Sequence, residues 1–171
     1  MFAKTDGSSI HNLTLDDAMV KGYRYVGGVV GYELNTGLSY LHVNDDVVDN
    51  SCNPGTCVWA RWGEYGGGVA GYMDGGTLTH ATSGGNVKGS GQKIGGLVGH
   101  LEGNYINDSS STAHVDGGYM VGGIVGEMNN ATLGNVHSTG HVEVVEEDHK
   151  TGSYGGGYYI SRRFDWFDRP D

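Results

Sequence analysis

The residues best suited to chemistry gather in one stretch of the chain, from Asn44 to Tyr65. This stretch combines aromatic rings with carboxylates. Carbohydrate-binding surfaces use the same combination, because aromatic rings stack on the C–H faces of sugars and carboxylates accept hydrogen bonds from sugar hydroxyls. The candidate ligand-binding residues are Asp45, Asp46, Asp49, Trp59, Arg61, Trp62 and Tyr65. The alternative is that Trp59 and Trp62 pack this stretch onto the chain beneath it.

The same stretch contains both cysteines of the chain, in the segment Cys52-Asn-Pro-Gly-Thr-Cys57. A Pro-Gly turn between them brings the two thiols together, so a local disulfide between Cys52 and Cys57 is favoured over a pair of reduced thiols. Two thiolates alone do not complete a zinc site, which needs four ligands.

A second polar stretch, Glu143-Val-Val-Glu-Glu-Asp-His149, is strongly acidic. It is expected to be a solvated charged loop, with calcium or a protein partner as the alternative contact. Polysaccharide-cleaving enzymes need carboxylates together with Arg or Lys near the cleaved bond. Here the basic residues are few and dispersed, so the sequence predicts no catalytic residue, no metal site and no cofactor, calcium excepted as the weaker alternative.

The composition limits the partners of the chain. It has 171 residues, 33 of them Gly, and a formal net charge of −10. With 10 Lys and Arg and no basic stripe, nucleic acid is not an expected partner. No apolar run approaches the length of a membrane span. The composition favours an extracellular or cell-surface location.

The element that must position these residues is a repeat. A box of the form Gly-Gly-apolar-apolar-Gly returns at residues 27–31, 67–71, 95–99 and 122–126, with a degenerate copy at 154–158. Repetition at this period indicates one structural unit stacked on copies of itself. The smallest spacing, 27 residues from Gly95 to Gly122, accommodates about three short strands for each repeat.

Aligned on the boxes, the segments between them form columns. One column contains Ile10, Leu38, Leu78, Ile106 and Leu133; a later one contains Met19, Val47, Val87, Val115 and Val142. These columns predict an all-β fold, a parallel β-solenoid of about five coils whose apolar columns point inward. Small residues in some columns, such as Ala81 and Ser83, predict a narrow interior. Paired glycines suit corners with positive φ or with closely approaching backbones.

The repeats differ in length only in the segment between the valine column and the next box. Leu38 lies 29 residues before Gly67, whereas Leu78 lies only 17 before Gly95. The long insertions therefore leave from the same corner of the coil, and insertions in repeat proteins gather on one face, often the binding face. The same alignment places His114 beside His141 in adjacent coils, with His137 four residues earlier; outward histidines of this kind bind a transition metal less often than they simply face solvent.

The boxes resemble the GLUG motif, a short Gly-Leu-hydrophobic-Gly repeat of bacterial surface and secreted proteins. Ile94-Gly-Gly-Leu-Val-Gly99 matches best, and Ser9–Leu15 resembles the segment that follows such a box; Ala70 and the final copy depart from it. Proteins with these repeats include large adhesins and IgA-peptidase-like proteins whose repeats lie outside the catalytic domain. The motif supplies no catalytic residue.

The sequence thus predicts a solenoid over residues 1–160 and a C-terminal cap or tail over 161–171. The expected role is a non-enzymatic adhesion or spacer module. Its partners would be a glycan or protein of a host or neighbouring cell, and other modules of a longer parent chain, because the repeat begins in mid-coil at Ala3. The alternatives are a polysaccharide lyase or hydrolase and a filament-forming structural subunit.

Overall fold

The computed structural model describes residues 1–49, 64–89 and 93–144, and all the regular structure in these residues is β-strand. The first coil contains β1 (Phe2–Asp6), β2 (Ser9–Gly22) and β3 (Tyr25–Gly27). The second contains β4 (Val30–Leu34), β5 (Gly37–Asp49) and β6 (Tyr65–Gly67). The third contains β7 (Ala70–Asp74), β8 (Thr77–Gly89) and β9 (Lys93–Gly95).

The fourth coil contains β10 (Val98–Glu102), β11 (Tyr105–Ser111), β12 (His114–Gly117) and β13 (Met120–Gly122). The fifth is represented by β14 (Val125–Asn129), β15 (Thr132–Ser138) and β16 (Val142–Val144). The described chain is therefore a parallel β-solenoid of about four complete coils with part of a fifth, as the sequence predicts. Among the described residues, no helix is long and apolar enough to cross a membrane.

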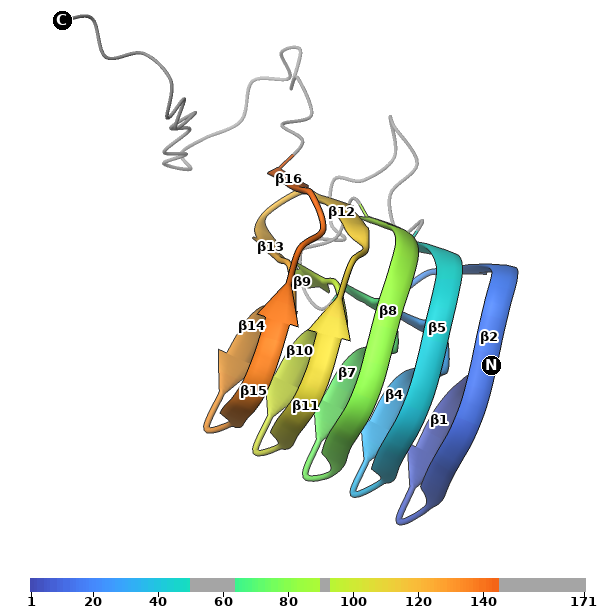
Figure 1. Cartoon of the computed structure of the whole chain (residues 1–171), viewed down its shortest axis with the longest axis vertical. Coiled ribbons are helices and arrows are strands. Elements are labelled where there is room, and N and C mark those ends of the chain that lie inside the picture. The colour runs from blue at the N-terminus through green and yellow to red at the C-terminus, as the bar shows by residue number, and fades with distance from the viewer. Residues whose placement is uncertain (50–63, 90–92, 145–171) are drawn as a thin grey trace, which may run out of the picture.

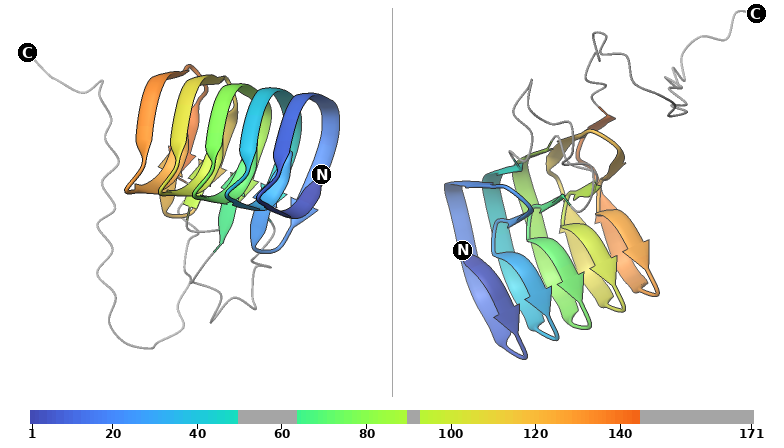
Figure 2. Two further views of the ribbon diagram at one scale, coloured as in Figure 1. Left: turned by 90° about the horizontal axis from the view of Figure 1, so that it is seen from below. Right: turned by 180° about the vertical axis from the view of Figure 1, so that it is seen from behind.

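Three parallel sheets form the sides of the solenoid (Figure 1). Sheet A has the order β1-β4-β7-β10-β14, and sheet C has the order β3-β6-β9-β13. Sheet B contains the long strands β2, β5 and β8. In the fourth and fifth coils the equivalent of each long strand is divided into two shorter strands, β11 and β12 in the fourth coil and β15 and β16 in the fifth. Each strand pairs with its counterpart one coil away, so the coils stack in a row (Figure 2). Backbone donors and acceptors are thereby satisfied between coils.

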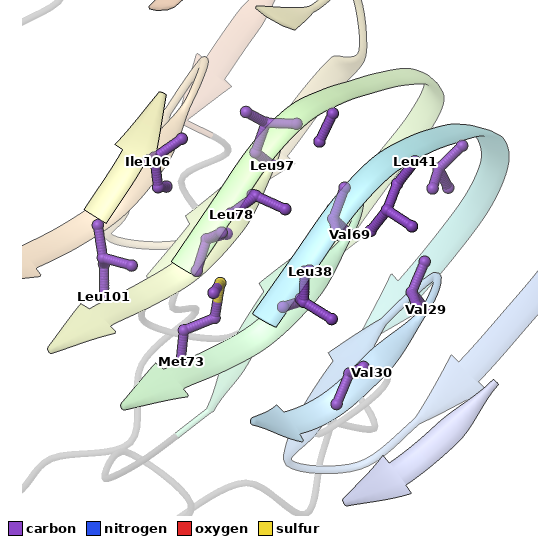
Figure 3. Packing of buried hydrophobic residues seen from close by; sticks show 14 of the residues in the cluster. Val29, Val30, Leu38, Leu41, Val69, Met73, Leu78, Leu97, Leu101 and Ile106 are labelled. Carbon is purple, nitrogen blue, oxygen red and sulfur yellow. The ribbon is translucent and has the colours of Figure 1, made fainter. Parts of the chain in front are cut away.

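The core consists of the inward columns that the repeat predicts. Leu38 pairs with Leu78, and Leu78 pairs with Ile106; all three side chains are fully buried. They pack against Val29, Val69 and Leu97 of the boxes (Figure 3). The narrow interior is confirmed by small buried residues. Ser83 Oγ donates to Gly96 O at 2.7 Å and lies 2.9 Å from Ser111 Oγ, so these hydroxyls are satisfied within the core.

A left-handed residue recurs within every coil of sheet B. Two residues after the first inward apolar residue, φ lies between 47 and 56° at Asn12, Tyr40, His80, Asp108 and Asn135. This backbone conformation interrupts the alternation of a strand. It explains why Leu38 and Leu41 both point inward although they are three residues apart, while Tyr40 is 59% exposed.

The prediction for Met19 is wrong. β2 contains a bulge in which Asp17 and Ala18 lie opposite the single residue Asp45 of β5. The extra residue moves Met19 outward, where it is 64% exposed, and Val20 pairs with Val47 in its place. The remainder of that column, from Val47 through Val87 and Val115, has the predicted register.

The boxes lie between sheet C and sheet A, and they demand glycine because backbones approach closely there. A Cβ on Gly27 would lie 2.6 Å from Ala70 Cα, and one on Gly95 would lie 2.8 Å from Gly126 N. The described glycines with positive φ are Gly7, Gly75, Gly85 and Gly103, and none belongs to a box. Positive φ instead marks the corner between sheets A and B, where every coil has Gly or Asn: Gly7, Asn35, Gly75, Gly103 and Asn130.

One carboxylate is enclosed in the core. Glu33 is fully buried in the column that Met73 and Leu101 continue. Its Oε1 accepts a hydrogen bond from Thr36 N, and its Oε2 accepts from Asp74 N at 3.2 Å and from Asn104 Nδ2 at 3.3 Å. Burial raises the pKa of Glu33, and these three donors act in the opposite direction.

Candidate binding surface

The predicted ligand-binding residues fall into two groups. Trp59, Arg61 and Trp62 lie outside the described residues, as do Cys52 and Cys57 with the predicted disulfide. The other four are described. Asp49 ends β5, and the structure places Asp45, Asp46 and Tyr65 in different environments.

Asp45 is buried, with 1% of its surface exposed. Its Oδ1 accepts a hydrogen bond from Ala18 N at 2.9 Å, so the side chain satisfies a donor that the bulge of β2 frees from the ladder. Asp46 accepts a hydrogen bond from Asn86 Nδ2 at 2.7 Å. It also lines a shallow hollow of about 210 Å³ beside the bulge, together with Asp17, Ala18, Met19, Asn44 and Gly85. Asp45 therefore supports the bulge, and Asp46 borders an acidic surface hollow.

Tyr65 packs among other aromatic side chains. It belongs to a group of rings at the corner between sheet C and sheet A, which we call the tyrosine strip: Tyr25, Tyr32, Tyr65, Tyr72 and His100. Two columns meet in it, because β3 pairs Tyr25 with Tyr65 of β6, and β4 pairs Tyr32 with Tyr72 of β7. The pairing of parallel strands thus repeats one ring per coil in each column.

The rings of the tyrosine strip are ordered face to face within a column. Tyr25 stacks on Tyr65 at 5.1 Å between centroids with planes 1° apart, and Tyr32 stacks on Tyr72 at 5.0 Å and 5°. Between the columns the rings meet edge to face, as for Tyr65 and Tyr72 at 5.2 Å and 82°. Both arrangements are favourable for aromatic quadrupoles. The strip is therefore an ordered aromatic surface.

Charged groups border the tyrosine strip at its far end. His100 continues the second column, stacks on Tyr72 at 4.8 Å and is nearly buried. Its Nδ1 lies 2.7 Å from a carboxylate oxygen of Glu127, which also forms an ion pair with Lys93. Lys93 Nζ lies 5.0 Å from the centre of the Tyr65 ring, a cation–π contact.

Burial and the Lys93 ammonium both shift the pKa values of His100 and Glu127. Burial lowers the pKa of His100, and the nearby Lys93 ammonium lowers it further, against the opposing pull of Glu127. Burial works against the charged form of Glu127, but Lys93 outweighs it and holds the pKa of Glu127 below its usual range. At neutral pH the histidine is therefore an uncharged ring between a carboxylate and the tyrosines.

The hydroxyls of Tyr32 and Tyr72 remain protonated. Burial, assisted by the Asp74 carboxylate, raises the pKa of Tyr72 to about 12, and the same causes raise the pKa of Tyr32. Both phenols therefore act as hydrogen-bond donors over the physiological pH range.

The near end of the strip differs in the two columns. Lys4 Nζ lies 5.6 Å from the centre of the Tyr32 ring and covers that end of its column. β3 is the edge strand of sheet C within the described residues, so Tyr25 has a stacked ring on one face only. Tyr25 is 37% exposed. A flat apolar face beside hydroxyl groups is suited to a sugar ring.

Of the residues in this strip, the sequence predicts only Tyr65 as a site residue, although the repeat contains a signal for the other tyrosines. Tyr25 and Tyr65 each stand two residues before a box, and Tyr32 and Tyr72 each follow a box directly.

The prediction that His114 and His141 are neighbours in adjacent coils is confirmed. Their rings stack at 4.9 Å between centroids with planes 12° apart.

Comparison with known proteins gives one similarity of fold. No family model matches the chain, and no curated protein matches it significantly. A crystal structure from Bacteroides ovatus, described as a candidate immunoglobulin A1 protease, superposes with a TM-score of 0.63 at 19% sequence identity. The superposition covers 90% of this chain and 46% of that one, so this chain spans less than half of its structural neighbour. At this identity the likeness supports the solenoid fold alone.

Proposed function

We propose that this chain is a non-enzymatic extracellular repeat module of a bacterial surface or secreted protein, in which the solenoid is a stiff scaffold and the tyrosine strip binds a glycan. In this proposal the Gly-Gly-apolar-apolar-Gly boxes are GLUG repeats. The observation that carries the proposal is the partly exposed ring of Tyr25, which stacks on Tyr65 and lies on the edge strand at the end of an ordered aromatic column.

The geometry supports a sugar as the ligand. A pyranose that stacks on Tyr25 would extend the column by one ring, on an aromatic surface that the stacks on Tyr65 and Tyr72 already hold in place. Little side-chain entropy is lost when a ligand meets a surface that is already ordered. Tyr32 and Tyr72 offer protonated hydroxyls in the adjacent column.

The similarity to the Bacteroides ovatus protein is in keeping with this role. The resemblance to GLUG repeats implies repeat regions that lie outside a catalytic domain, and this chain matches less than half of its neighbour. We therefore propose that this region presents or spaces other modules, and we assign the proteolytic description of the neighbour to that protein alone.

The test is a glycan array probed with the labelled chain and with Tyr25→Ser. The matched control is Tyr105→Ser, because Tyr105 is similarly exposed, at 40%, but lies on sheet B away from the strip. Loss of one stacked ring should weaken binding by up to about tenfold in Tyr25→Ser and not in Tyr105→Ser. Equal binding by both variants, or no bound glycan, contradicts the proposal. Release of reducing or unsaturated sugar ends would favour the enzyme alternative.

A second candidate is a structural role through end-to-end stacking. β1, β2 and β3 each pair on one side only within the described residues, and Phe2 is 47% exposed on β1. Such strand edges accept another coil readily. Light scattering that grows with protein concentration would support this candidate, and a monomer at all concentrations would exclude it.

A further inference from the structure

A His-Val-carboxylate sequence occurs twice on the outer part of sheet B. His114-Val115-Asp116 begins β12, and His141-Val142-Glu143 occupies the equivalent place in the next coil at β16. Val115 pairs with Val142, and both belong to the valine column that is buried in the earlier coils. Because side chains alternate along a strand, the residues that flank these valines project outward.

The register turns the two sequences into a square of four side chains. Asp116 pairs with Glu143, and the ring of His114 stacks on that of His141. One ligand atom each from His114, Asp116 and Glu143 lies within 4.8 Å of the other two. His141 Nε2 lies 3.9 Å from Glu143 Oε2 and brings a second imidazole to the same edge.

One atom of this group lacks a suitable partner. Asp116 Oδ1 is buried and accepts no hydrogen bond of good geometry, although His114 Nε2 lies 2.8 Å away. Removing a carboxylate oxygen from water without a satisfactory donor is costly, and a cation bound between the oxygen and the imidazole would offset that cost.

We propose that His114, Asp116, His141 and Glu143 bind one divalent transition-metal ion, with zinc as the best fit. Two imidazole nitrogens and two carboxylate oxygens form a tetrahedral zinc donor set, with bonds of about 2.0–2.2 Å. Three of the donors, from His114, Asp116 and Glu143, already lie within 4.8 Å of one another, and His141 Nε2 joins them as the fourth through its neighbour Glu143. The backbone of two paired strands fixes their origins in advance.

Lys88 is the one described cation in contact with the group. Its Nζ lies 3.3 Å from Asp116 Oδ2, and its side chain is 53% exposed. The ammonium competes with a metal for Asp116 but can move away into solvent. Lys88→Met removes this competitor and is expected to tighten metal binding.

The test is calorimetric titration of the metal-stripped chain with Zn²⁺. It is run in a Cys52→Ser/Cys57→Ser background, because thiolates bind zinc by themselves. One ion should bind per chain, and His114→Ala/His141→Ala should weaken binding by at least about tenfold, since loss of a ligand costs no less than loss of an outer-shell partner. Co²⁺ offers a second readout, in which visible absorption bands typical of a tetrahedral site should appear and should be lost in the double variant.

The matched control is His80→Ala. His80 also stacks on a ring, that of Tyr40, and faces the Asp108 carboxylate at 3.9 Å, but among the described residues its neighbours in the adjacent coils are not histidines. This variant should bind Zn²⁺ as tightly as the parent. The proposal is overturned if the double variant, with an unchanged circular dichroism spectrum, binds Zn²⁺ as well as the parent does, or if the parent binds none.

Discussion

Glu33 and Asn104 are joined by a hydrogen bond across an intervening coil. Asn104 Nδ2 donates to Glu33 Oε2 at 3.3 Å, although Glu33 belongs to the second coil and Asn104 to the fourth. The third coil leaves room for this contact because it has Gly76 at the corner, where a Cβ would collide with the Glu33 carboxylate. Asn104 also accepts a hydrogen bond from Gly75 N at 2.7 Å, so the amide is held on both sides.

We expect Glu33→Leu to lower the free energy of unfolding by about 1–3 kcal/mol at neutral pH, because all three partners of the carboxylate are buried or half-buried donors and leucine would leave them without an acceptor. Chemical denaturation monitored by circular dichroism measures the change. A variant as stable as the parent would show that the buried hydrogen bonds contribute nothing net.

The same residue gives a pH prediction. The pKa of Glu33 is raised in the folded state, so the folded protein binds the proton more tightly than the unfolded chain. The contribution of Glu33 to stability is therefore largest below the unfolded value of 4.5 and falls as pH rises through the folded pKa. The parent should gain stability on acidification relative to Glu33→Gln. Parallel pH profiles for the two proteins would contradict this assignment.

His100 predicts the opposite trend. Its pKa is lowered in the folded state, so its contribution to stability is fully present above the unfolded value of 6.5 and is lost as pH falls towards the folded pKa. His100→Phe retains a ring against Tyr72 but cannot titrate. The loss of unfolding free energy between neutral and mildly acidic pH should therefore be smaller in His100→Phe than in the parent. Identical losses would exclude His100 as the source.

The box glycines predict a contrast between two alanine substitutions. Gly95→Ala forces a Cβ against the backbone of the next coil, which cannot yield without separating the coils, so we expect a loss of about 3 kcal/mol or more. Gly103→Ala places a Cβ in open space at a φ of +63°, which costs only about 1 kcal/mol. Thermal or urea denaturation of both variants measures the difference. Equal losses would mean that close approach is not what the box requires.

The column of residues with left-handed backbone in sheet B predicts that two substitutions of Tyr40 differ in stability. Tyr40→Asn and Tyr40→Val both lose the ring stacked on His80, so a comparison of the two isolates the backbone. Asn accepts φ near 53° and the β-branched Val does not, and we expect Tyr40→Val to be less stable than Tyr40→Asn by about 1–2 kcal/mol. If Val is the more stable of the two, strand propensity outweighs the left-handed backbone at this site.

The columns of the solenoid could be predicted because inward residues repeat in type. The register of Leu38, Leu78 and Ile106 follows directly from spacing to the box. Met19 could not be placed, because the bulge in β2 adds one residue without a change in the apolar pattern. The corner between sheets A and B could have been found from its Gly or Asn in each coil, whereas Tyr40 and His80 give no sequence sign of a left-handed backbone.

Tyr65 is the one predicted site residue that lies in the tyrosine strip. The sequence groups Asp45 with Tyr65 because both border an insertion, but Asp45 is buried at a bulge and Tyr65 is one ring of a column. Spacing along the chain does not show which side chains contact one another between adjacent coils. The stacked pairs Tyr25–Tyr65 and His114–His141 become visible only when the repeats are laid side by side.

The link from Glu33 to Asn104 changes the cooperativity expected of the stack. A linear repeat array behaves as a chain of nearest-neighbour couplings, in which each unit can fray once the unit beside it has gone. A contact between the second and fourth coils adds a next-nearest-neighbour coupling, so loss of either coil also weakens the other through the third. Unfolding should then proceed as one block over the second to fourth coils, and fraying should be confined to the coils outside it.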